Sequence, residues 1–90
     1  MHQIRRPPTL DFDWLRAFVT VADARNFTTA GAAIGATQSA VSIRIRKLEQ
    51  RLGQSLMERN ARGVHLTRFG SVFLPDARRS RCTTTRRHVR

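Results

Sequence analysis

The chain has 90 residues, of which 17 are lysine or arginine and 6 are aspartate or glutamate, so its formal charge is +11. A chain this short forms one small domain and buries too little surface to house a deep substrate cavity with a full catalytic constellation. Its longest apolar runs are three residues, far below the roughly 20 that span a bilayer, and its one cysteine, Cys82, has no partner for a disulfide or a zinc site.

The chain begins with a predicted loose arm over 1–12 and a helix over 13–24. The arm has paired prolines and two arginines but no periodic apolar pattern. In the helix, apolar residues recur at helical spacing. Asp11 or Asp13 can cap the N–H groups of its first turn, so we expect a stable start there.

A short second helix and a tight turn follow. Thr28 or Thr29 can cap an alanine-rich segment that runs to Ile34. Gly35 then permits the left-handed backbone that often follows a helix end. Thr37 is a natural N-cap for the next helix, so the two helices are predicted to be joined by a turn of few residues.

The third helix is predicted over 38–52 and is amphipathic. Its buried stripe consists of Val41, Ile45, Leu48 and Leu52. Its opposite, mostly polar face carries Gln38, Ser39, Ser42, Ile43, Arg46 and Gln50. Gly53 is expected to end the helix.

A β-hairpin and a fourth helix are predicted next. Two short strand-like runs flank a turn over 60–63 that carries Arg62. Thr67 can cap a helix over 68–79, although a proline inside it weakens the later turns. Residues 80–90 are rich in arginine and threonine with almost no apolar side chains, so we expect a disordered tail.

This order of elements predicts a mainly α-helical, winged helix-turn-helix domain over 13–67. A helix about 10 to 12 Å across fits the major groove of B-DNA, which is about 12 Å wide. Near the start of the third helix, Gln38 can bind adenine through two hydrogen bonds, and Ser39 and Ser42 can bond base edges or phosphates. The basic charge also favours a polyanionic partner, and we predict double-stranded DNA.

An ordered series of motifs runs through the same region. It includes Leu15-Arg16-Ala17-Phe18, Asn26-Phe27-Thr28-Thr29-Ala30, Thr37-Gln38-Ser39-Ala40-Val41-Ser42, Leu48-Glu49, Leu52-Gly53, Leu56-Met57-Glu58-Arg59, Leu66-Thr67 and Ala77-Arg78. In this combination, residues 13–79 resemble the N-terminal DNA-binding domain of LysR-type transcriptional regulators. The resemblance implies a winged helix-turn-helix that binds operator DNA sequence-specifically as a dimer.

The resemblance also implies roles for single residues. The base contacts it implies are Gln38, Ser39, Ser42 and Ile43. The phosphate contacts it implies are Thr28 and Thr37, and it places Arg62 of the wing near the minor groove. Arg46, on the polar face of the third helix, is predicted as a further backbone contact. Ile43 stands where the family often has a long polar or basic residue, so we expect an apolar contact there, such as one to a thymine methyl group.

Family members usually continue into a long linker helix and an effector-binding domain. We therefore expect 68–79 to be a truncated linker helix and the chain to lack a small-molecule effector domain. A homodimer is predicted through Leu15, Phe18 and the 68–79 helix. Two alternatives remain open: a remnant that binds polyanions nonspecifically through its basic tail, and a dimerisation module that interferes with full-length relatives.

The remaining polar residues give little support for catalysis. Glu49 and Glu58 lie on different predicted elements, so no carboxylate pair is expected. The histidines, His2, His65 and His88, lack metal-ligand spacing. We predict a cytoplasmic, nucleoid-associated protein that is not an enzyme, with no cofactor, no metal and no membrane contact.

Overall fold

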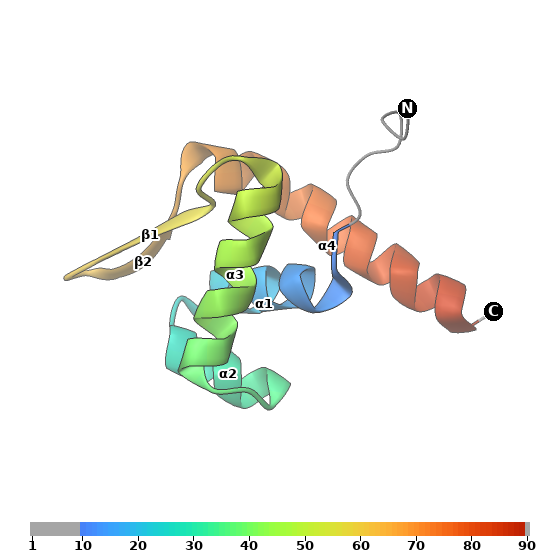
Figure 1. Cartoon of the computed structure of the whole chain (residues 1–90), viewed down its shortest axis with the longest axis horizontal. Helices are drawn as coiled ribbons and strands as arrows, with labels where there is room; N and C mark the ends of the chain where they lie inside the picture. Colours follow the sequence, from blue (N-terminus) through green and yellow to red (C-terminus); the bar gives the residue numbers. More distant parts are fainter. Residues whose placement is uncertain (1–9, 90) are drawn as a thin grey trace.

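The computed structural model describes the backbone of residues 10 to 89 and the side chains of residues 10 to 80. Its elements are α1 (Phe12–Ala24), α2 (Phe27–Ile34), α3 (Gln38–Leu52), β1 (Met57–Asn60), β2 (Gly63–Leu66) and α4 (Arg68–Val89). The first three helices form a central group, the hairpin projects to one side and α4 runs out on the other (Figure 1). This mainly α-helical arrangement confirms the predicted winged helix-turn-helix. Most of the arm predicted over 1–12 lies outside the described residues.

The first two helices begin at side chains that cap them. The Asp11 carboxylate accepts a hydrogen bond from the Asp13 N–H at 2.8 Å, so α1 begins one residue earlier than predicted. The Asn26 side chain accepts from the Thr29 N–H at 2.8 Å and caps α2. The prediction that Thr28 or Thr29 is this cap is wrong, because Asn26 is the residue with extended backbone and both threonines are already helical.

The turn between α2 and α3 brings two backbone segments into close contact. Gly35 ends α2 with a φ of 70°, and the Thr37 hydroxyl oxygen accepts from the Ala40 N–H at 3.0 Å, which confirms both predicted caps. A Cβ added to Gly31 would lie 2.5 Å from the carbonyl oxygen of Ala36. The glycine therefore allows the turn to fold back onto α2.

The third helix and the hairpin follow the predicted pattern closely. α3 has the predicted ends, and it stops at Gly53 with a φ of 77°. The hairpin is antiparallel, with Asn60 paired to Gly63, so Ala61 and Arg62 form its loop. The Glu49 carboxylate accepts from the Leu56 N–H at 2.7 Å and ties the end of α3 to the start of the hairpin.

The core is built around α1, which contacts α2, α3 and α4. Leu15 and Phe18 are 4% and 0% exposed, and the Phe18 ring lies 5.9 Å from the ring of Phe73 on α4. The prediction that Leu15 and Phe18 join two copies of the chain is therefore wrong. Their apolar face is covered by helices of the same chain.

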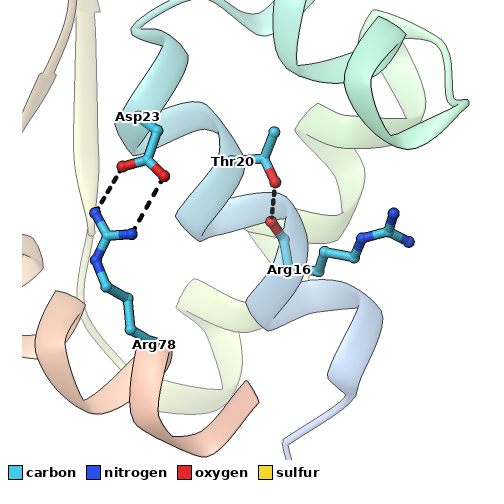
Figure 2. Close-up of polar contacts among 4 residues, drawn as sticks. All are labelled: Arg16, Thr20, Asp23 and Arg78. Carbon is cyan, nitrogen blue, oxygen red and sulfur yellow. Dashed lines mark hydrogen bonds and ion pairs between the residues drawn. The ribbon is translucent and has the colours of Figure 1, made fainter. Parts of the chain in front are cut away.

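The fourth helix is longer than predicted and is attached to α1. Arg78 donates two hydrogen bonds to the Asp23 carboxylate, at 2.6 and 3.2 Å (Figure 2). The bond to Asp23 is the main cause of a raised pKa at Arg78. Ala77 beside it is fully buried, so the helix belongs to the core as far as this point.

The structure continues α4 as helix to Val89, where the sequence predicts disorder from residue 80. No glycine or proline follows Pro75 within the helix, and arginine is a good helix former. Low apolar content indicates that a segment does not pack into a core, but it does not prevent a helix. Within residues 10 to 89, no helix is long and apolar enough to cross a membrane.

Candidate nucleic-acid interface

The first half of α3 presents a continuous accessible face. Gln38, Ser39, Ile43 and Arg46 are exposed and Ser42 is half-buried. These positions share one side of the helix because the buried side is fixed by Val41, Ile45 and Leu48. Arg46 lies eight positions after Gln38, which is about 12 Å along a helix axis. The structure thus brings the predicted base contacts and Arg46 together on one face.

Ile43 is the unusual member of this face. Its side chain is 49% exposed, and it belongs to a set of just three large apolar residues with high exposure among those the structure describes: Phe12, Ile43 and Val72. Burial of apolar surface is favourable by about 25 cal/mol per Å². An isoleucine with this exposure beside polar neighbours therefore gains from contact with an apolar group of a partner.

The two predicted phosphate-binding threonines lie beside the start of α3. The Thr28 hydroxyl donates to the Gln38 Oε1 at 3.4 Å, so α2 helps to orient the Gln38 amide. The Thr37 hydroxyl oxygen is engaged as the cap of α3, yet its own proton remains available to an external acceptor. Both side chains are exposed.

The wing ends in an ordered loop. The Arg62 N–H donates to the Asn60 side-chain oxygen at 2.8 Å, which fixes the loop backbone. The Arg62 side chain is exposed and lies in the two-residue loop of the hairpin. The hairpin projects away from the three central helices (Figure 1). The wing therefore carries its charge at a point that stands away from the helical core.

A hollow of about 380 Å³ lies between α2, the start of α3 and the hairpin. Its lining includes Arg25, Arg59, Thr28 and Gln38. The guanidinium carbon of Arg59 lies 4.1 Å from the centroid of the Phe27 ring. Sequence reasoning missed both arginines, because their proximity depends on how the hairpin folds back toward α2. The signal that existed was the position of Arg59 in a strand-like run of the predicted hairpin.

The described side chains offer no competing site for a metal. Within residues 10 to 80, no group of three His, Cys, Asp or Glu residues is placed to hold a metal ion. A second hollow lies between α1, β2 and α4, and its charged residues include Asp23 and Arg78, which already pair with each other. The exposed face of α3, the two threonines and the wing are therefore the best candidate for a functional surface.

Known proteins share this architecture. Residues 12–71 match the family described as "Bacterial regulatory helix-turn-helix protein, lysR family". The HTH-type transcriptional regulator ShiR of Corynebacterium glutamicum (strain R) is 44% identical over 69 residues, which is 77% of this chain and 23% of ShiR. The regulator PecT of Dickeya dadantii (strain 3937) is 47% identical over 70 residues, covering 78% of this chain and 22% of PecT.

Among solved structures, the CbnR_DBD-DNA complex is similar with a TM-score of 0.81 and 36% sequence identity. The similarity covers 87% of this chain and 90% of that one. The chain spans less than a quarter of the length of ShiR and of PecT, and the part that it matches contains the helix-turn-helix.

Proposed function

Because the chain belongs to the lysR family of bacterial regulatory helix-turn-helix proteins, we propose that it binds double-stranded DNA at specific sequences and thereby regulates transcription. The observation that carries the proposal is the exposed face of α3, where Gln38, Ser39 and Ile43 stand open beside a helix start. Such a face inserts into the major groove, where each base pair presents a distinct pattern. The proposed function requires no catalytic step and places the protein in the cytoplasm, on the nucleoid.

Each proposed contact has its own chemistry. Gln38 is assigned to adenine, whose N6 and N7 match an amide group. Ser39 and Ser42 are assigned to neighbouring base edges, and Ile43 to a thymine methyl group. The phosphate contacts are assigned to Thr28, Thr37 and Arg46, and Arg62 to the backbone beside the minor groove. For Thr28 this requires its one hydroxyl proton to turn from the Gln38 Oε1 to the phosphate.

The proposal includes a second copy of the chain. The side of α4 that faces solvent leaves Val72 67% exposed, although Phe73 and Leu74 next to it pack against the core. An apolar side chain in this position can be covered by the α4 of another copy. Dimers of this kind bind two half-sites related by a two-fold axis, so we expect a palindromic site.

Selection from a random duplex library tests the proposed function. We expect a preferred sequence with two half-sites. We also expect Gln38→Ala to weaken binding to that sequence by about 1 to 3 kcal/mol and to relax the preference at one base pair. The measurement is a titration of labelled selected and scrambled duplexes. Gln50→Ala is the matched control, because Gln50 is an exposed glutamine near the other end of the same helix. Equal losses on both duplexes for Gln38→Ala would contradict the base-reading role.

The wing should contribute without reading sequence. We expect Arg62→Ala to weaken binding to selected and scrambled duplexes alike and to reduce the slope of log affinity against log salt by about 1. Titrations at several salt concentrations measure both effects. A loss confined to the selected duplex would mean that Arg62 contacts a base instead.

A further inference from the structure

The hollow between α2 and the hairpin contains two arginines that the proposed base and wing contacts leave unused. Resting on the proposed DNA-binding function, we propose that this hollow holds one phosphate of the DNA backbone, bound by Arg25 and Arg59. The site is separate from the tip of the wing and adds a contact to the DNA backbone beside the start of α3.

Arg59 is held in place before any ligand arrives. Its guanidinium stacks on Phe27, which is 8% exposed and therefore fixed by the core. Stacking occupies the face of the guanidinium and leaves its N–H groups directed outward along the edges. Planar N–H donors of this kind match the paired oxygens of a phosphate.

Arg25 approaches the same hollow from the end of α1. Among the described residues it is the one non-glycine residue with a positive φ, at 58°. A left-handed backbone costs an ordinary residue about 1 to 2 kcal/mol, so a glycine or an asparagine would fit this position at less cost. The arginine contributes a charge to the lining of the hollow that neither of those residues would supply.

Nothing in the hollow neutralises these charges. Its lining contains no aspartate or glutamate. Within residues 10 to 80, neither Arg25 nor Arg59 pairs with a carboxylate. Glu58, next to Arg59 in β1, lies on the opposite face of the strand, because successive side chains alternate. The hollow is therefore a cationic recess with open hydrogen-bond donors.

The position of the hollow identifies its ligand. Gln38 lines it and also begins the face proposed to enter the major groove. The walls of that groove are the phosphates of the two strands, so a phosphate lies next to any side chain that enters at its edge. Binding of this phosphate would set the depth of Gln38 and fix the register of α3 on the base pairs.

The test uses the full chain, the selected duplex and a scrambled duplex. The variants are Arg59→Gln and Arg25→Asn, the second of which keeps a residue type that tolerates a positive φ. The matched control is Arg51→Gln, since Arg51 also stacks on an aromatic ring, that of Trp14, near the far end of α3. Circular dichroism and thermal unfolding establish that each variant is folded.

We expect each hollow variant to bind both duplexes about tenfold more weakly than the control variant does, with a smaller salt slope. A series of duplexes, each with one phosphate replaced by an uncharged methylphosphonate, then locates the contact. At one position the replacement should weaken wild-type binding about tenfold and weaken Arg59→Gln binding very little. That coupling identifies the bound group as a phosphate of the duplex.

Two results would overturn the inference. One is an affinity and salt slope for both hollow variants equal to those of Arg51→Gln. The other is a methylphosphonate profile that is the same in wild type and Arg59→Gln at every position. Failure of the proposed function looks different, because wild type would then bind selected and scrambled duplexes equally, while a smaller salt slope for the two hollow variants than for Arg51→Gln would still report a phosphate contact in the hollow.

Discussion

Replacing Gly70 by alanine is expected to destabilise the domain by about 3 kcal/mol or more. Gly70 lies in the first turn of α4, where its N–H donates to the Thr67 hydroxyl oxygen at 2.9 Å. An added Cβ would lie 2.0 Å from the carbonyl oxygen of Leu56. That oxygen is fixed, because it accepts a hydrogen bond from the Thr67 N–H at 3.0 Å. The start of α4 must therefore move away from the hairpin to admit one methyl group.

Thermal unfolding measures this effect. A loss of this size lowers the midpoint by about 12 °C or more in a domain of fewer than 100 residues. Gly53→Ala is the matched control, because Gly53 has a φ of 77° but nothing within 4 Å of the place where its Cβ would lie. Its cost is expected to be that of the backbone alone, about 1 to 2 kcal/mol. If Gly70→Ala proves no more destabilising than Gly53→Ala, the close contact with Leu56 is not rigid.

Truncation of Phe18 to alanine is the other large expected effect, at about 3 to 5 kcal/mol. Phe18 is fully buried, and its ring packs against Phe73, which itself stacks on Phe69 at 5.9 Å. Removing the ring leaves a cavity between α1 and α4 that neither helix can close without breaking other contacts. Urea unfolding at two protein concentrations measures the loss.

The concentration dependence distinguishes the two roles considered for Phe18. Truncating a residue in the core of one chain lowers the free energy of unfolding by the same amount at both concentrations. Truncating a residue between two copies has an effect that depends on the concentration. Val72→Ala is the contrasting variant on α4, because Val72 is 67% exposed and is proposed to lie between two copies. Its expected cost within one chain is below about 0.5 kcal/mol, and any further cost should depend on protein concentration. A Phe18→Ala variant with near wild-type stability would place the ring outside the core.

The third helix could be predicted from sequence almost to the residue. Its start, its buried stripe and its end depend on Thr37, Val41 and Gly53, and each of these signals acts within one or two turns. The hairpin was located for the same reason, since the turn residues lie next to one another in the chain. The sequence was sufficient to predict an element wherever the residues that determine it lie close together in the chain.

Features that depend on distant partners were not predicted. An apolar helix face shows that something covers it, but the pattern around Phe18 is the same whether the cover is α4 or a second chain. The stacking of Arg59 on Phe27 depends on the orientation of the hairpin relative to α2, which no periodicity reports. The proposed base contacts and Arg46 share one face of α3 as predicted, and the individual roles of all the proposed contacts remain predictions.

The attachment of α4 to α1 has a mechanical consequence. Phe18 with Phe73, and Asp23 with Arg78, join these two helices at separate points along their lengths, and α1 also packs on α3. A bending force applied to the distal turns of α4 would therefore rotate α1 together with α4, because the two helices do not move independently where they are joined. Such a movement would reach the face of α3 proposed to contact DNA as a tilt of α3, because α1 packs on both α3 and α4.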